Sequence, residues 1–246
     1  MQQSTRTRKL VILAMLSALA YVLMVYGRIP VLTIPPYLKY DPKDVIFTVG
    51  GFLFGPLPVL AMSVVVSLVE MITVSDDIIL GGLLGGLIGA TMNVISTCAF
   101  ACTASLIYKK LHSLKGAIIG LITGWIFTAV VMMILNYVMT PIYIALLSQG
   151  LSDMEAFSKS VNELRPYVAT LLIPVFLPFN LLKGGLNAAL TMLIYKPVRV
   201  GLSKSGLLPV TTAAAIPSKI NFGAMVISFL VLLAGIILIL SYQGII

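Results

Sequence analysis

Six polar side chains interrupt stretches of sequence that are otherwise apolar enough for a membrane interior. They are one carboxylate, one ammonium and four amides: Glu70, Asn93, Asn136, Asn180, Lys183 and Asn187. Such groups are costly in lipid and usually face a cavity or a partner. An amide both donates and accepts hydrogen bonds, a lysine donates and a carboxylate accepts. The set therefore suits capture of a polar but largely uncharged small molecule.

The spacing of these residues predicts that four of them converge at one depth. Glu70 falls near the outer end of the third span, and Asn136 in the outer part of the fifth. The prolines of the sixth span favour a helix that begins close to Pro178. Asn180 and Lys183 then also lie toward the outer side, three residues apart on one helix face.

A lysine inside a span needs a partner, and for Lys183 the candidates are Glu70 or a bound ligand. Asn187 continues the Asn180/Lys183 face one turn deeper. For Asn93 and Asn187 two interpretations stay open. They contribute to the same site, or they only hydrogen-bond a neighbouring helix.

The chain has no recognisable catalytic set. The only histidine, His112, falls in a polar loop, no G-x-x-x-x-G-K-[ST] phosphate loop occurs, and the spans lack paired carboxylates. Cys98 and Cys102 lie four apart in an apolar span, and we interpret them as small packing residues rather than zinc ligands. We therefore expect a protein that is not an enzyme and has no catalytic residue, metal or cofactor.

Composition predicts that membrane spans carry these residues. Of the 246 residues 59% are hydrophobic and 10% are charged, and the mean hydropathy is +1.09. A soluble domain carries about 25% charged residues, so we predict an all-α integral membrane protein. Arg6, Arg8 and Lys9 precede an apolar run long enough to span, with no cleavage site after it, so this run is not a cleaved signal.

The second apolar run, 45–74, contains the letters GPLP at 55–58, which end a helix. The run is either one kinked span or two short spans. Two spans with a cytoplasmic N-terminus put most Lys and Arg residues, and no Asp or Glu, on the cytoplasmic side, as the positive-inside rule requires. We therefore favour two spans, and we assign the net charge of +8 to membrane orientation rather than to nucleic acid.

The predicted organisation is a six-span core followed by one additional C-terminal span. The core covers 1–200, with spans near 10–27, 45–55, 57–74, 79–108, 116–147 and 167–195. A cytoplasmic linker over 201–219 and an extra span within 220–246 follow, and 148–165 is an external loop. No tandem repeat is visible, which disfavours transporters built from inverted repeats.

Small residues recur at helical spacing in three spans. Ala14 and Ala18 let another helix approach closely, either inside the chain or from a partner. The glycine rows fit tight helix packing, because none follows a strand or matches a nucleotide fingerprint. These rows are Gly81/Gly85/Gly89, Gly82/Gly86/Ala90 and Gly116/Gly120/Gly124.

Four motifs resemble the substrate-binding S components of energy-coupling-factor (ECF) vitamin transporters, and most of all the riboflavin-specific type. They are PPYLKYDPKD at 35–44, GFLFGP at 51–56, ILNY at 134–137 and LPFNLLKG at 177–184. The resemblance covers roughly residues 8–200, and the extra span departs from the usual six-span plan. It implies a protein of a prokaryotic cell membrane that binds its vitamin from outside.

The resemblance also implies partners. An S component of this family joins an EcfT-type transmembrane coupling protein and a pair of cytosolic ATPases, and topples in the membrane to carry its pocket inward. Ala14 and Ala18 match the family's face for the coupling protein.

For riboflavin, Asn136, Asn180 and Lys183 match family positions that hydrogen-bond the isoalloxazine edge and the ribityl chain. The other implied contacts are Glu70 and four residues of the first loop, Leu38, Tyr40, Asp41 and Asp44. This loop, IPPYLKYDPKDV at 34–45, contains three prolines that restrict its backbone. Less entropy is then lost when it closes on a ligand, and we interpret it as a lid.

Other functions stay open. The chain is an S component for another vitamin or for flavin mononucleotide (FMN), or it is a channel or a carrier that works alone. A membrane enzyme acting on lipids or prenyl groups is disfavoured, because no carboxylate falls on the predicted cytoplasmic side.

Overall fold

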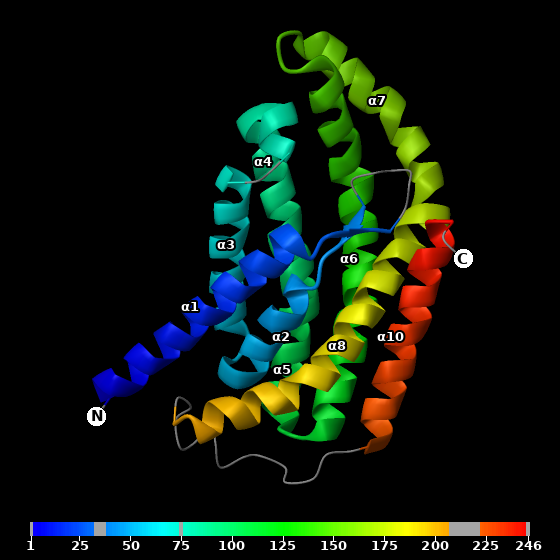
Figure 1. Cartoon of the computed structure of the whole chain (residues 1–246). Helices are drawn as coiled ribbons and strands as arrows, with labels where there is room; N and C mark the ends of the chain where they lie inside the picture. Colours follow the sequence, from blue (N-terminus) through cyan, green and yellow to red (C-terminus); the bar gives the residue numbers. More distant parts are fainter. Residues whose placement is uncertain (1, 32–37, 74–75, 207–221, 245–246) are drawn as a thin grey trace.

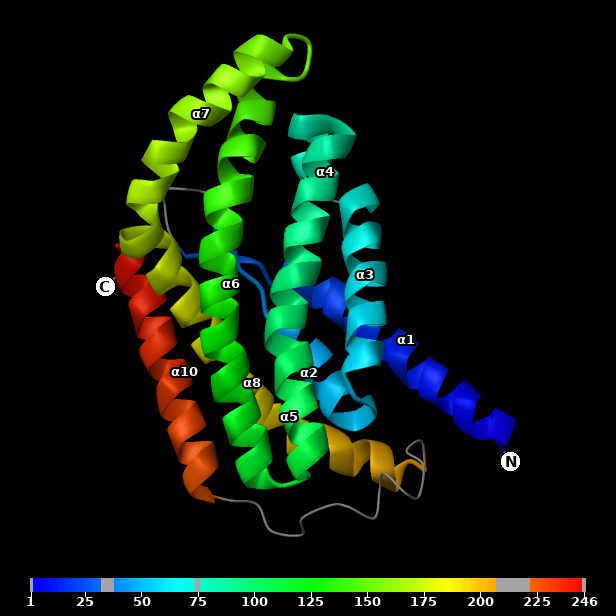
Figure 2. The ribbon, with the colours of Figure 1, turned by 180° about the vertical axis from the view of Figure 1, so that it is seen from behind.

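The computed structural model describes residues 2–31, 38–73, 76–206 and 222–244. Residues 34–37 of the predicted lid, most of the predicted linker 201–219 and the ends of the predicted segment 220–246 lie outside this range. The described residues form a bundle of helices that run up and down, with a short hairpin beside them (Figures 1 and 2).

The first part of the chain holds two long helices, a short one and the hairpin. These elements are α1 (Gln2–Tyr26), β1 (Ile29–Pro30), β2 (Lys39–Tyr40), α2 (Lys43–Phe54) and α3 (Pro56–Thr73). The rest is helical: α4 (Asp76–Thr97), the π-helical turn η1 (Cys98–Cys102), α5 (Thr103–Leu111), α6 (Leu114–Gln149), α7 (Met154–Leu171), the π-helical turn η2 (Leu172–Phe176), α8 (Leu177–Lys204) and α10 (Phe222–Tyr242).

Six helical stretches in the described part of the chain are long and apolar enough to cross a membrane. They are Arg6–Tyr26, Pro56–Thr73, Gly82–Leu111, Leu114–Ser148, Met154–Lys204 and Phe222–Tyr242. The predicted all-α membrane protein with an additional C-terminal helix is thereby confirmed.

The short helix α2 differs from these six. Its 12 residues span about 18 Å, less than the roughly 30 Å hydrocarbon core of a bilayer. All of its residues except Phe54 are buried. The segment predicted as a span near 45–55 therefore lies within the bundle and is enclosed by other helices.

The run 45–74 turns at Gly55. This residue has φ +89°, a conformation open to glycine and unfavourable for other residues. Its N–H donates to the carbonyl oxygen of Gly51 at 2.7 Å, and Pro56 begins α3. The chain reverses direction here, so α2 and α3 run antiparallel (Figure 1).

Two runs depart from uniform α-helix. The run expected at 79–108 bends at Gly82, where φ is +62°, and passes through η1 before α5. The turn η2 joins α7 to α8, and α7 fills much of the segment expected as an external loop. Asp153 begins α7 by accepting hydrogen bonds from the N–H groups of Glu155 and Ala156. Turns of π-helix are frequent at functional sites.

Glycines bring α6 into contact with η1 and α5. A Cβ atom added at Gly124 would lie 2.6 Å from the carbonyl oxygen of Phe100, and one at Gly120 would lie 2.7 Å from that of Ala104. These neighbours are backbone atoms, which no rotamer change can move away. The predicted packing role of Gly120 and Gly124 is confirmed.

We predict that Gly124→Ala lowers the free energy of unfolding by about 1–3 kcal/mol, the usual cost of overpacking. The matched control is Gly201→Ala, because Gly201 is exposed in α8 with nothing near its Cβ position. There alanine should be neutral or stabilising, since it favours the helix over glycine. Thermal unfolding in detergent measures both, and equal melting temperatures for the two variants would contradict the close contact.

Candidate functional site

The hairpin positions the first group of candidate residues. Ile29 pairs with Tyr40 and Pro30 with Lys39 in an antiparallel ladder, and the N–H of Val31 donates to the carbonyl oxygen of Leu38 at 3.4 Å. Leu38 and Tyr40 are both buried in one apolar cluster with residues of α8. An isolated two-stranded hairpin is marginally stable at best, and each strand here has only two residues. Packing against the bundle therefore fixes the position of the residues that follow, Asp41 and Asp44.

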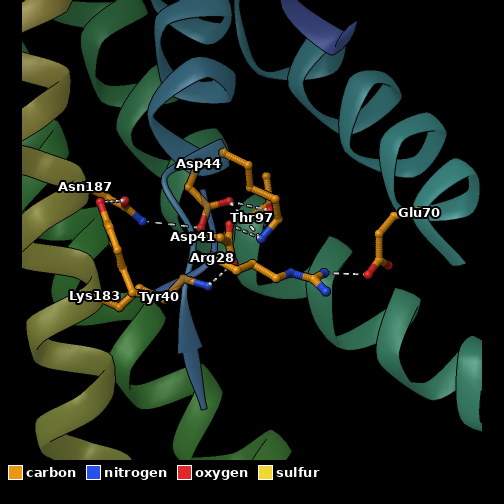
Figure 3. Close-up of polar contacts among 9 residues, drawn as sticks. Arg28, Tyr40, Asp41, Asp44, Glu70, Thr97, Lys183 and Asn187 are labelled. Atoms are coloured by element: carbon orange, nitrogen blue, oxygen red, sulfur yellow. Dashed lines mark hydrogen bonds and ion pairs between the residues drawn. The ribbon is translucent and has the colours of Figure 1, made fainter. Parts of the chain in front are cut away.

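Asp41 is the centre of a buried group of charges (Figure 3). Its Oδ1 accepts a hydrogen bond from Lys43 Nζ at 2.9 Å, and its Oδ2 accepts one from Lys183 Nζ at 3.2 Å. Lys43 is 1% exposed and also lies 3.9 Å from Asp44 Oδ1. The hairpin, α2 and α8 are thus joined by ion pairs that are largely removed from solvent.

Asp44 connects the same region to η1 and to the deeper part of α8. Its Oδ1 accepts from the Thr97 hydroxyl at 2.6 Å, and its Oδ2 accepts from Asn187 Nδ2 at 3.4 Å. The Tyr40 hydroxyl donates to Asn187 Oδ1 at 3.0 Å. Asn187 is almost fully buried, and both ends of its amide take part in this network.

The surroundings set the protonation of the two hairpin groups. Burial alone would raise the pKa of Asp41, but Lys183 and Lys43 outweigh it and hold the pKa below its usual range. Burial, and then the charges of Asp41 and Asp44, raise the pKa of Tyr40 well above its usual value. Asp41 is therefore an ionised acceptor and Tyr40 a neutral donor at neutral pH.

Contacts with α6 fix the orientation of α8. Trp125 Nε1 donates to the carbonyl oxygen of Leu181 at 2.8 Å. A Cβ atom at Gly184 would lie 2.3 Å from the indole ring of Trp125, and the same ring covers Gly185. The glycine that ends the LPFNLLKG motif thus makes room for Trp125, next to Lys183.

Asn136 and Asn180 are buried and bonded within their own helices. Asn136 Nδ2 donates to the carbonyl oxygen of Met132 at 2.7 Å, and its Oδ1 accepts from Thr140 at 3.1 Å. Asn180 Nδ2 donates to the carbonyl oxygen of Phe176, the last residue of η2, at 2.7 Å. The structure does not join them by hydrogen bonds to the Asp41 network.

Glu70 lies apart from Lys183. It forms a partly buried ion pair with Arg28, which follows α1 (Figure 3). Of the two expected candidates, Glu70 and a bound ligand, Glu70 is not the partner of Lys183, because Asp41 pairs with that ammonium. Glu70 instead ties α3 to the segment that leads into the hairpin.

Several residues with contacts in this region are not indicated by the sequence. Lys43, Arg28 and Thr97 have no role among the expected site residues, and the role of Asn187 is left open there. A signal existed for Lys43, which stands between two aspartates in PPYLKYDPKD. Thr97 and Arg28 carried no such signal, because their partners are 53 and 42 residues away in sequence.

The predicted partner-binding pair lies on the surface of α1. Ala14 and Ala18 are exposed, whereas Ile12, Leu16 and Ala20 are buried and face the bundle. The two alanines therefore do not pack inside the described part of the chain.

Among the described residues, no group of three or more His, Cys, Asp or Glu is placed to hold a metal ion. The network provides hydrogen-bond donors and acceptors near the hairpin, which suit binding of a polar molecule rather than catalysis. The helices define the class: an all-α, multi-pass membrane protein.

The family follows from comparison with known proteins. A family model described as ECF transporter, substrate-specific component, matches residues 8–195. The chain belongs to this family of substrate-specific (S) components, which are transport subunits and not enzymes. The resemblance seen in the four motifs is confirmed.

The chain is similar to curated riboflavin transporters. FmnP of Bacillus subtilis (strain 168) is 31% identical over 192 residues, which cover 77% of this chain and 91% of that protein. RibU of Staphylococcus aureus (strain TCH60) is 31% identical over 197 residues, covering 80% and 91%. A solved S component of a bacterial ECF transporter has a TM-score of 0.60 at 26% identity, covering 80% of this chain and 98% of that one.

We predict that Asp41→Asn lowers the free energy of unfolding by about 3 kcal/mol, since it leaves buried ammonium groups without their full partner. A carboxyl group with a lowered pKa stabilises the fold above its ordinary pKa, and this contribution is lost only as the pH falls through the lowered value. The difference from the parent should therefore be constant between about pH 5 and 8.

The control for this measurement is Glu163→Gln, which removes an exposed carboxylate of α7 and should change stability by less than about 0.5 kcal/mol. Thermal unfolding of detergent-solubilised protein reports both values. An Asp41→Asn protein as stable as the parent would mean that the ion pairs do not hold the hairpin.

Proposed function

We propose that this chain is the riboflavin-binding subunit of an ECF-type uptake transporter. The observation that carries the proposal is the match to two riboflavin transporters over more than three quarters of the chain. The candidate site residues fall within the part of the chain that the family model matches. They are Leu38, Tyr40, Asp41, Asp44, Glu70, Asn136, Asn180 and Lys183, all within 8–195.

The side chains suit the chemistry of riboflavin. The isoalloxazine ring has wide apolar faces, an imide edge that both donates and accepts, and a ribityl chain with hydroxyl groups. Asparagine amides complement an imide, a lysine donates to carbonyl oxygens, and carboxylates accept from hydroxyls. An analogue with a different polar pattern would leave such groups buried and unpaired, which is costly.

Lys183 can take a ligand as an additional hydrogen-bond partner. In the structure Lys183 Nζ is held by Asp41 at 3.2 Å, and its side chain is 14% exposed. A ligand carbonyl that accepts a hydrogen bond from one N–H group of this ammonium leaves the other two for Asp41, since lysine has three donors. Lys183 then links the ligand to the hairpin without losing its counter-charge.

We further propose a cytoplasmic N-terminus, an outward-facing hairpin and assembly with an EcfT-type protein and two cytosolic ATPases. The positive-inside bias supports the orientation. Exposure of Ala14 and Ala18 supports a helix-docking face on α1, since small residues let a second helix approach closely. The bundle has α1 at one edge, where a partner can reach it (Figure 1).

Titration with riboflavin tests the proposal. The purified chain should quench riboflavin fluorescence on binding, and Lys183→Ala or Asn180→Ala should weaken binding at least tenfold, because each removes a polar contact in a buried site. Both variants should still insert in the membrane. Expression level and elution as a single species check this.

Three results would contradict riboflavin as the ligand or the pocket as assigned. Undiminished binding by Lys183→Ala would remove this residue from the site. Stronger binding of FMN or another vitamin in the same titration would select a different S-component ligand. Uptake by the chain alone in liposomes, without ATPases, would select a self-sufficient carrier.

The docking face gives a separate prediction. Ala14→Trp or Ala18→Trp should leave riboflavin binding unchanged, because both side chains point away from the bundle. Transport by the assembled complex should fall, since the larger ring keeps the partner helix at a distance. The matched control is Leu19→Trp, on an exposed and already bulky position of the same helix. Loss of riboflavin binding in the alanine variants would mean that they pack internally.

A further inference from the structure

The C-terminal helix α10 lies outside the part of the chain that the family model matches, which ends at residue 195. It runs beside α8 and ends near the hairpin (Figures 1 and 2). Its place at the hairpin raises the question of what it contributes to the site.

One narrow face of α10 contacts the rest of the chain. Its less exposed residues recur mostly every three or four positions: Ala224, Ser228, Leu232, Gly235, Ile239 and Leu240. Gln243, directly after the helix, continues the series. The large side chains between them, such as Ile236, Ile237 and Leu238, are exposed. This spacing forms a single stripe along the helix, so α10 packs on one side and presents lipid-facing residues on the others.

Gly235 sets the distance between α10 and α8. A Cβ atom at this position would lie 2.5 Å from Leu186 Cδ2 and 3.1 Å from Leu186 Cγ, with Leu182 also in reach. Leu186 is itself buried one residue before Asn187. The close approach therefore occurs behind the face of α8 that carries the polar network.

The end of α10 contacts the hairpin in two ways. Ile239 belongs to the same buried cluster as Val31, Leu38 and Tyr40. One turn further, Gln243 Nε2 donates to the carbonyl oxygen of Pro30. Val31 and Leu38 are the residues that face each other at the end of the described hairpin.

The hairpin is therefore held between two helices. On one strand Tyr40 donates to Asn187 of α8, and on the other Pro30 accepts from Gln243, the residue that follows α10. A hairpin this short needs such outside contacts. We propose that α10 is a positioning element for the hairpin, and that Gln243, Ile239 and Gly235 slow riboflavin release by holding the described strands of the hairpin, 29–31 and 38–40, in place against α8. This inference rests on the proposed function for its ligand.

We expect the contacts of α10 to change the rate at which riboflavin dissociates. The contacts at the end of α10 are made with the hairpin, and differences among variants of one binding site usually appear in the off-rate. A helix that served only as a membrane anchor would alter neither the off-rate nor the hairpin.

The test compares Gln243→Glu with the parent, using the full chain in lipid nanodiscs. This change keeps the shape of the side chain and replaces the donor by an acceptor facing the Pro30 carbonyl. Release of radiolabelled riboflavin into excess unlabelled riboflavin should accelerate at least about threefold, while the association rate stays within about twofold. Gln243→Lys, which restores a donor, should return the release rate toward that of the parent.

A second variant tests the helix contact. Gly235→Leu should displace α10 from α8 and accelerate release more than Gln243→Glu does. Gly223→Leu is the matched control, an identical change at an exposed position of α10, and should have no effect. Equal release rates in Gly235→Leu, Gln243→Glu and the parent would overturn the proposal.

Amide hydrogen exchange separates this inference from the riboflavin assignment. In protein without ligand, residues 29–31 and 38–40 should exchange faster in Gln243→Glu and Gly235→Leu than in the parent and Gly223→Leu. If the parent binds no riboflavin, the ligand assignment fails while this comparison still tests the support given by α10. If amide exchange of the hairpin is unchanged in both variants, α10 does not hold the hairpin, even where riboflavin binds. If exchange is faster but the riboflavin release rate is unchanged, the hairpin contacts of α10 do not control release.

Discussion

The rest of the structure depends on the need to pair charges that have left water. Asp41, Lys43 and Lys183 sit where an isolated charge would be severely destabilised, and each is stabilised only because the others are present. Asp41 and Lys43 join the end of the hairpin to the start of α2, and Lys183 belongs to α8, so the need for pairing specifies where the hairpin and α2 meet the distant helix α8. Asp44 extends the condition to Thr97 and Asn187. A polar interior of this kind specifies one arrangement of the helices more sharply than apolar contacts, which tolerate sliding.

Close helix approach is the second requirement, and it is met by residues without side chains. Gly124 rests on the backbone of Phe100, Gly184 on the ring of Trp125, and Gly235 on Leu186. These contacts lie on successive pairs, α6 with η1, α6 with α8, and α8 with α10. Because van der Waals packing drives helix association in lipid, this chain of close contacts carries the position of α8 outward to both neighbours. The close helix contacts at these glycines thus fix the position of α8, the helix that carries Lys183 and Asn187 of the charge network.

Much of this could be predicted from the sequence, and the failures have physical causes. Hydropathy and the Gly55-Pro56 break describe the path of the chain well, because the cost of exposing polar groups to lipid dominates other terms. The small-residue row at Gly120 and Gly124 was also informative. Asp41 was not among the expected partners of Lys183, because depth along a span says nothing about helix rotation or about how far a loop descends. Asp41 belongs to a loop, yet its carboxylate reaches Lys183 of α8. The sequence also did not indicate that α2 is short and buried, because an apolar run has the same composition whether it faces lipid or protein.

The position of Trp125 has a spectroscopic consequence. It is the single tryptophan of the chain, its ring lies against Gly184, and its indole nitrogen is fixed to Leu181. All intrinsic indole emission therefore originates from one residue, packed against the glycine that follows Lys183. Tryptophan emission overlaps the near-ultraviolet absorption of a flavin, so energy transfer to a bound flavin would be governed by one donor distance. The packing of Trp125 against α8 thus also gives the protein a single energy-transfer donor at a fixed position.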